Sequence, residues 1–157
     1  MNKKYITRRI LDKYSEDEFS KELIKLEQQP FFPFKDTGID IVGIDKHNNP
    51  FFYQLKARNI GIRIKEYWFM VDKKKLEKFP KTKKSYWVFC CFKDTDIFDF
   101  FIVPLSITKK WYKIHNDGCK KKQEKHHLSI KPISKGKYEL SPKRLNKYIN
   151  IMKYYLK

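Results

Sequence analysis

The chain has 157 residues, 41% of them hydrophobic, which is enough for one domain with a real core. No apolar run approaches the ~20 residues of a membrane span, and the basic N-terminus lacks the apolar block of a secretory signal. Three cysteines, two of them adjacent at Cys90 and Cys91 inside an apolar run, do not suggest a disulfide framework. We therefore expect a protein that is not secreted and is cytoplasmic, or associated with the nucleoid or nucleus.

The charge balance is strongly basic: 36 Lys and Arg residues oppose 18 Asp and Glu residues, a formal net charge of +18. Such a charge predicts a polyanionic partner, and nucleic acid is the usual one. Lysine is accompanied by many Asn, Ile, Tyr and Phe residues, so an AT-rich coding genome is an alternative source of part of the charge. DNA is the partner that we expect.

A helix is predicted to start at Ser15, because Ser15 and Glu18 form a capping box. It should end near Gln29, since Pro30 restricts the residue before it. Its apolar stripe would consist of Phe19, Leu23 and Leu26. Residues 30–38, with two prolines and a glycine, then form an irregular approach to the next element.

Residues 36–58 read as strand, turn, strand. Residues 39–45 and 50–58 have β-branched and alternating patterns, and the turn between them contains Asn48 and Asn49, which tolerate positive φ. Alternate strand residues share a face, so Gln54 and Lys56 point the same way and a hairpin can bring Asp40 toward them. Buried polar groups are costly in mid-sheet, so this patch indicates a site.

The residues Asp36, Gly38, Ile39 and Asp40, followed by Gln54 and Lys56, carry a family resemblance. This pattern resembles the active-site signature of the PD-(D/E)XK nuclease superfamily, in the D-x-G-[IV]-D and Q-x-K variant of Mrr-like restriction endonucleases. The likeness covers about residues 15–105 and is most specific over 36–58. It implies an α/β (α+β) class with a restriction-endonuclease-like mixed β-sheet flanked by helices. The departure from the common pattern is Gln54, where most members carry an acid.

The resemblance also implies a catalytic site. Asp40, Gln54 and the backbone carbonyl of Leu55 would hold Mg²⁺, with Mn²⁺ as an alternative ion, because hard cations take oxygen ligands. Lys56 would orient the attacking water or offset the charge that grows on phosphorus.

Members of the superfamily often add a helix glutamate, and Glu16 and Glu22 are both candidates. Acids in a first helical turn also complement the dipole, and Glu22 can pair with Lys25, so a purely structural role stays open for each. Asp36 is either a second acid near the metal or a turn carboxylate that accepts from backbone amides.

Further basic residues are candidates for phosphate contact. Arg58 and Arg63 suit bidentate contact, although they can equally be ordinary solvated cations. Residues 67–71 predict a strand, and 72–79 a short basic helix. The lysines of this helix either face DNA or form a solvated face: Lys73, Lys74, Lys75 and Lys78. Residues 85–92 predict a central strand covered on both sides, and 98–105 an antiparallel neighbour.

The C-terminal third changes character. Residues 107–115 predict a helix, and 120–137 a loop or extended basic arm with Lys120, Lys121 and Lys122 on phosphates. A zinc site is not expected from His115, Cys119, His126 and His127, because neither C-x-x-C nor H-x-x-x-H spacing is present.

Ser141 and Pro142 predict the start of a final amphipathic helix. Its apolar stripe must dock on the core or on a second subunit, and we expect a homodimer or higher homo-oligomer. The chain is thus read as one domain, 1–157, with a core over about 15–105 and a basic C-terminal helical appendage over about 106–157.

Two functions of different class remain. The first is a metal-dependent DNA endonuclease of restriction, homing or junction-resolving type. The second is a catalytically inactive nucleic-acid-binding module with the same fold, which Gln54 keeps open.

Overall fold

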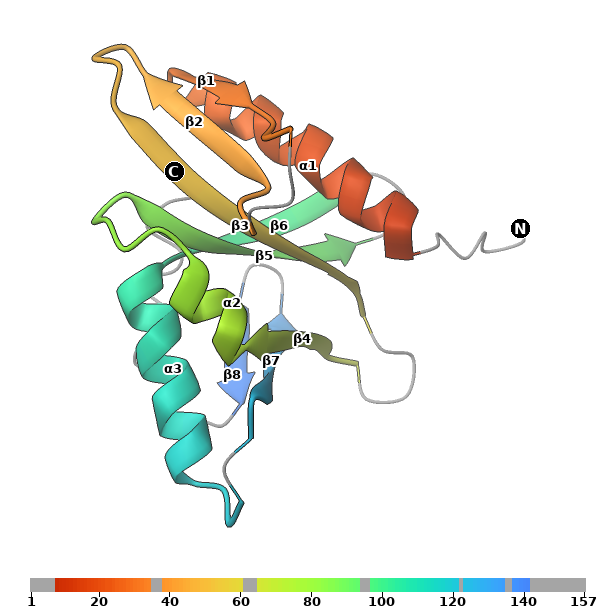
Figure 1. The fold of residues 1–157 in the computed structure, drawn as a ribbon. Helices are drawn as coiled ribbons and strands as arrows, with labels where there is room; N and C mark the ends of the chain where they lie inside the picture. The colour runs from red at the N-terminus through yellow and green to blue at the C-terminus, as the bar shows by residue number, and fades with distance from the viewer. Residues whose placement is uncertain are drawn as a thin grey trace.

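The computed structural model describes residues 8–34, 38–60, 65–93, 97–121, 123–134 and 137–141. Within these residues the chain forms three helices and eight strands (Figure 1). Their bounds are α1 (Arg8–Lys25), β1 (Gln28–Phe31), β2 (Ile41–Asp45), β3 (Pro50–Asn59), β4 (Tyr67–Asp72), α2 (Lys73–Lys78), β5 (Ser85–Lys93), β6 (Ile97–Pro104), α3 (Leu105–Asp117), β7 (Lys125–Ser134) and β8 (Lys137–Ser141). No helix in these ranges is both long enough and apolar enough to cross a membrane.

The strands form two sheets. A five-stranded sheet has the order β1-β2-β3-β5-β6, and a three-stranded sheet has the order β4-β7-β8. In the larger sheet β3 and β5 run parallel while the other pairs are antiparallel, so the predicted mixed α and β architecture is confirmed. The crossover from β3 to β5 passes through β4 and α2, which gives the parallel pair the long connection it needs.

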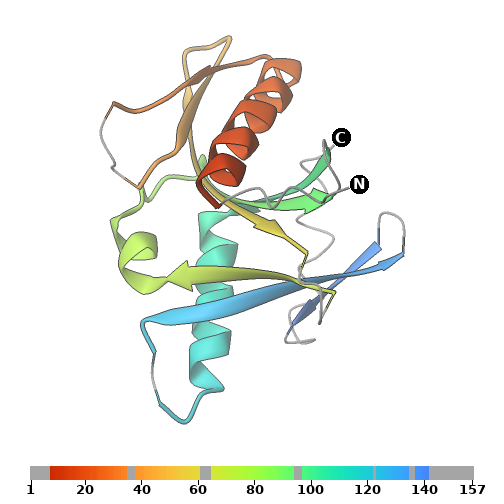
Figure 2. The ribbon, with the colours of Figure 1, turned by 90° about the vertical axis from the view of Figure 1, so that its right-hand side faces the viewer.

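Helix α1 lies across one face of the larger sheet (Figures 1 and 2). Leu11, Ser15, Phe19 and Leu23 follow one another at a spacing of four residues, and all four are buried. Phe19 packs its ring edge against Tyr53 of β3, with ring centroids 5.2 Å apart. This contact places α1 directly over the strand that carries Gln54 and Lys56.

The other face of the larger sheet packs against the smaller sheet and α3. Phe69 of β4 meets Phe89 of β5 at 5.1 Å between ring centroids, and Trp111 of α3 lies 5.8 Å from Phe89. Strand β5 is therefore covered on both sides, as predicted. Cys90 belongs to the cluster under α1 and Cys91 to the opposite cluster, so both cysteines are core residues.

The turn between β2 and β3 and the start of α2 also agree with expectation. Asn48 adopts φ 59°, and the carboxylate of Asp45 accepts hydrogen bonds from the backbone N–H groups of His47 and Asn49, each at 2.9 Å. Asp72 caps α2, because its side chain accepts from Lys74 N at 2.9 Å. Strands β5 and β6 pair antiparallel as predicted.

The predicted limits of the first helix were wrong. α1 already includes Arg8, and Ser15 lies mid-helix, where its hydroxyl donates to the carbonyl of Asp12 at 2.7 Å. The helix ends at Lys25, and Leu26, which was expected on the apolar stripe, is 44% exposed.

The strand β1 that follows was not predicted. Pro30 lies within it, and the sheet tolerates the missing N–H because β1 is an edge strand that pairs only with β2. The restriction that Pro30 imposes on its neighbour thus marks an extended segment and not the end of a helix.

The expectation of a loop or extended arm over residues 120–137 was also wrong, since β7 and β8 occupy much of it. His126, Leu128 and Ile130 are buried and His127 and Lys131 are exposed, which is the alternation of a strand, interrupted only by the buried Ser129. The predicted final helix lies outside the described residues, and with it the surface expected to dock on a second subunit.

We expect Leu23→Ala to lower the free energy of unfolding by about 2–5 kcal/mol, because Leu23 is fully buried between α1 and the sheet. Ile24→Ala is the matched control, since Ile24 is 63% exposed and its loss should change stability by less than about 0.5 kcal/mol. Urea unfolding of both variants measures the difference. Equal losses would contradict the docking of α1 described above.

Candidate functional site

The site begins where β2 separates from β3. The last paired residues of the two strands are Ile41 and Tyr53, and the N–H of Asp40 still donates to the carbonyl of Tyr53 at 2.9 Å. Beyond that point the N–H of Leu55 donates instead to the Asp40 carboxylate, Oδ2, at 2.6 Å. A charged side chain therefore takes the place of a backbone acceptor in the sheet.

The amide of Gln54 completes this arrangement. Its Nε2 donates to the same Oδ2 of Asp40 and also to the carbonyl oxygen of Leu55, at 3.3 Å for the latter. The carboxylate and the carbonyl thus converge on one point, which the amide nitrogen occupies. The other amide atom, Oε1 of Gln54, is buried and has no hydrogen-bond partner among the described residues.

These residues fit a hard divalent cation. The two converging oxygens belong to a carboxylate and a carbonyl, and a half-turn of the Gln54 amide about its last torsion exchanges Nε2 for Oε1. A bound cation would then give Oε1 the partner that it lacks, where a buried orphan costs about 1–3 kcal/mol. Oxygen-only donor sets of this kind are what Mg²⁺ prefers.

Lys56 lies one step further on the same face of β3 as Gln54, as predicted from the strand period. Its Nζ is 5.9 Å from the centre of the Trp87 ring. Burial lowers the pKa of Lys56, the positive charge of Lys75 lowers it further, and Asp40 opposes both. An ammonium with a lowered pKa beside a carboxylate is typical of functional sites.

The surroundings of Asp40 disfavour the ionised form of its carboxyl group. Burial raises the pKa of its carboxyl group, and the hydrogen bond from Leu55 and the charge of Lys56 only partly offset this. A cation that bound there would stabilise the ionised carboxylate of Asp40. The electrostatics and the geometry of the oxygen donors therefore favour the same kind of ligand.

The structure distinguishes the two helix glutamates. Burial raises the pKa of Glu16, Lys13 opposes this, and the charge of Asp40 raises it further, so Glu16 and Asp40 are electrostatic neighbours. Glu22 instead forms a surface ion pair with Lys25 at 2.6 Å, which is the structural alternative considered for it. Glu16 also pairs with Lys13 at 3.5 Å, so both glutamates have a lysine partner on the helix. What distinguishes Glu16 is that the charge of Asp40 acts on it.

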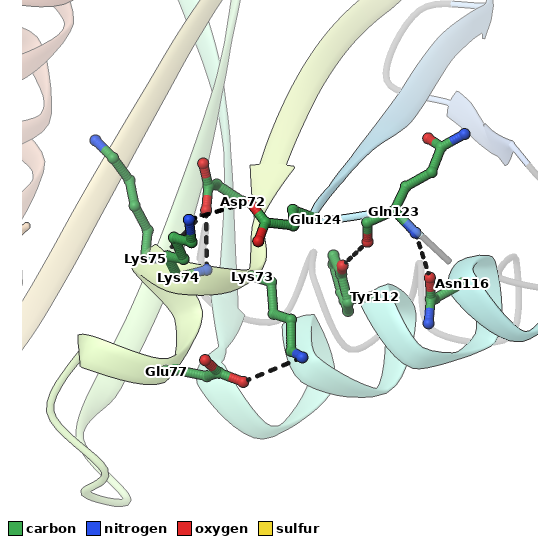
Figure 3. Close-up of polar contacts among 9 residues, drawn as sticks. All are labelled: Asp72, Lys73, Lys74, Lys75, Glu77, Tyr112, Asn116, Gln123 and Glu124. Carbon is green, nitrogen blue, oxygen red and sulfur yellow. Dashed lines mark hydrogen bonds and ion pairs between the residues drawn. The ribbon is translucent and has the colours of Figure 1, made fainter. Parts of the chain in front are cut away.

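Lys75 of α2 was expected only as one of several lysines on a helix face that either contacts DNA or is solvated, and its effect on Asp40 and Lys56 was not predicted. Its charge acts on both Asp40 and Lys56. In Figure 3 its side chain extends away from the side of α2 on which Lys73 meets Glu77. It stands within a run of three lysines, and only the docking of α2 decides which of them approaches the site.

Arg58 follows Lys56 on the same face but is held by backbone. Its Nε donates to the carbonyl of Trp68 at 3.1 Å and one terminal nitrogen donates to the carbonyl of Ala57 at 2.6 Å, which ties β3 to β4. These contacts favour a structural role over the phosphate contact expected for it.

Other lysines expected to face DNA are either paired with carboxylates or exposed far from the β2–β3 hairpin. Lys73 pairs with Glu77 at 3.7 Å and Lys74 with Glu124 at 3.3 Å, in agreement with the alternative of a solvated charged face (Figure 3). Lys120 and Lys121 are exposed in the turn that follows α3, at the end of the molecule away from the β2–β3 hairpin (Figure 1). Asp36, Arg63 and Lys122 lie outside the described residues.

Comparison of the chain with protein-family models, with curated proteins and with solved structures found no match.

We expect Asp40→Asn to raise the melting temperature at pH 7 in EDTA. The pKa of Asp40 is raised from 3.8, so its contribution to stability is fully present below that value and is lost as the pH rises through the folded-state pKa. Asparagine keeps an acceptor for Leu55 and cannot ionise. The gain should therefore disappear as the pH is lowered toward 3.8.

Asp45→Asn is the control of opposite sign. Hydrogen bonds led by that from Asn49 lower the pKa of Asp45, so its contribution is present at neutral pH and is lost in acid. Its replacement should lower the melting temperature at pH 7. If Asp40→Asn did the same, the ionised Asp40 would not carry the electrostatic cost assigned to it.

Proposed function

We propose that this protein is a Mg²⁺-dependent DNA endonuclease with a restriction-endonuclease-like fold, in which Mn²⁺ can replace Mg²⁺. The observation that carries the proposal is the convergence of the Asp40 carboxylate and the Leu55 carbonyl on the Gln54 amide, with Lys56 next along the same face. The pKa values of Glu16 and Asp40 are raised and that of Lys56 is lowered, and Asp40 is among the charges that act on the other two.

The reaction would be hydrolysis of one phosphodiester. A water oxygen forms a bond to phosphorus, an ester P–O bond breaks, and the two protons of the water end on the leaving hydroxyl and in solution. When bound, the metal ion supplies a Lewis acid for the phosphate and lowers the pKa of the attacking water.

The residues of the site would have separate roles in this hydrolysis. Asp40, Gln54 and the Leu55 carbonyl would hold the ion, and Glu16 would add a second carboxylate that orients water beside it. Lys56 would position the attacking water and offset charge on the phosphate, at a place where burial strengthens its electrostatic effect.

The distribution of lysines supports a polyanionic substrate. A groove of about 310 Å³ lies near the start of β5 and α3, and three of its lining residues are lysines. The lysines are Lys81, Lys83 and Lys109. Ser85, which also lines it, pairs in register with Phe52, two positions before Gln54 on the same face of β3. Phosphates of a bound strand would thus be attracted to the face that carries the site.

The second candidate is a nucleic-acid-binding module without catalysis. It is favoured by one observation: the group that meets the two converging oxygens is a neutral amide, which brings no formal charge to a cation. The two functions differ in their need for metal and for Lys56.

Incubation with supercoiled and branched DNA in Mg²⁺, Mn²⁺ or EDTA tests the proposal. We expect cleavage in Mg²⁺ and Mn²⁺ only. Asp40→Ala and Lys56→Met should each lower the rate by about 100-fold or more, because each removes a group that acts on the reacting phosphate. Binding to DNA in Ca²⁺ should be nearly unchanged for Lys56→Met, since one lysine is a small part of so basic a surface.

Lys46→Met is the matched control, because Lys46 is an exposed lysine that pairs with Glu27 at 3.1 Å. It should cleave at the parent rate. Cleavage that survives both Asp40→Ala and Lys56→Met would mean that the chemistry lies elsewhere. Tight DNA binding by a parent protein that cleaves neither substrate would favour the binding module.

A further inference from the structure

A second cluster of potential metal ligands lies at the far end of α3 from the β2–β3 hairpin. His115, Cys119 and His126 each bring one ligand atom to it, and these atoms all lie within 4.8 Å of one another. The three residues come from the last turn of α3, the turn that follows and the start of β7. Their convergence is a product of the fold and does not depend on the function proposed above.

The turn after α3 places the first two ligands. Gly118 caps the helix in the αR conformation and donates back to the carbonyl of Ile114 at 3.3 Å, so the helical path continues past Asp117. Residues four apart then share one side. The Sγ of Cys119 is accordingly 4.0 Å from Nδ1 of His115, and it lies 3.3 Å from the His115 carbonyl.

The third ligand is held against the helix. The His126 side chain is buried, its ring centroid lies 4.7 Å from that of His115, and its Nε2 is 3.0 Å from Oδ1 of Asn116. An amide oxygen can only accept, so this contact requires a proton on Nε2 and leaves the lone pair of His126 on Nδ1. Such outer partners are what orient metal-binding histidines.

The connection between α3 and β7 is also hydrogen-bonded to α3. Asn116 Oδ1 also accepts from the N–H of Gln123 at 3.1 Å, and the Tyr112 hydroxyl donates to the carbonyl of Gln123 (Figure 3). The segment between Cys119 and His126 is thus anchored to α3 at its middle.

We propose that His115, Cys119 and His126 bind Zn²⁺ and clip the end of α3 to β7. One thiolate and two imidazoles form a borderline-soft donor set that suits zinc and not magnesium. Tetrahedral zinc holds such atoms roughly 3.4–3.6 Å apart. Small side-chain rotations that move the ligand atoms by about 1 Å would therefore bring them to zinc-binding distance.

Three protein ligands leave one position for water, as in zinc sites that remain open. A cavity of about 10 Å³ bordered by His115, His126 and Leu128 has room for about one water molecule. The sequence rule that excluded zinc sought paired motifs, whereas this cluster has the spacing H-x₃-C-x₆-H and is assembled by tertiary packing.

Alkylation of the unaltered chain tests the proposal without any variant. Cys119 is half-buried while Cys90 and Cys91 are buried, so N-ethylmaleimide in native buffer should modify Cys119 first. After EDTA treatment and dialysis, about one equivalent of Zn²⁺ should slow that reaction about tenfold or more, because the metal-bound thiolate is masked. Mg²⁺ should have no effect.

Cobalt substitution identifies the ligands. Co²⁺ should give a thiolate-to-metal charge-transfer band that Cys119→Ser abolishes, while His126→Gln should weaken Zn²⁺ binding by about 100-fold or more. His47→Gln, in the β2–β3 turn, is the control and should bind like the parent. Circular dichroism checks that each variant is folded, and where one is not, the alkylation result on the parent decides.

Unchanged alkylation of Cys119 in Zn²⁺ would overturn the proposal. Equal protection in a folded His126→Gln variant would also overturn it, since the metal would then be held by other groups.

Discussion

The interaction on which the site depends is the hydrogen bond from the N–H of Leu55 to the Asp40 carboxylate. A buried backbone donor must find an acceptor, and here β2 begins only at Ile41, opposite Tyr53, so it supplies no carbonyl opposite Leu55. The sheet therefore accepts a charged group at a place where burial opposes its ionisation. Gln54 and Lys56 are brought to that charge by the strand period alone.

The surrounding fold explains why the site has two sides. The five-stranded sheet separates the core under α1 from the core against the smaller sheet and α3. At the point where β2 and β3 part, both sides reach Asp40: Glu16 comes from α1, and Lys75 comes from α2. Burial raises the pKa of Asp40 although the hydrogen bonds from Leu55 and Gln54 and the charges of Lys56 and Lys75 act in the opposite direction. Under the proposed function, a bound cation would add to these stabilising partners.

Those parts of this arrangement that follow from local pattern could be predicted from the sequence. The alternation of β3, the apolar run of β5 and the asparagines of the β2–β3 turn each determine their structure within a few residues. Other features depend on distant contacts. Pro30 is compatible with a strand only because β1 is an edge, and Glu16 is distinguished from Glu22 only by the way α1 docks. The lysines of residues 120–137 concealed the alternation of His126, Leu128 and Ile130, and with it the cluster at the end of α3.

The proposed function requires that the oxygens around Gln54 bind a hard divalent cation. Mn²⁺ replaces Mg²⁺ at oxygen ligands and broadens nearby NMR signals, so a titration of ¹⁵N-labelled protein with substoichiometric Mn²⁺ tests it directly. If a hard cation binds there, the signals of the Leu55 backbone amide and the Gln54 side-chain amide should broaden first, and excess Mg²⁺ should restore them. Broadening that begins at exposed acids such as Glu27 or Glu77, with Leu55 unaffected, would contradict it.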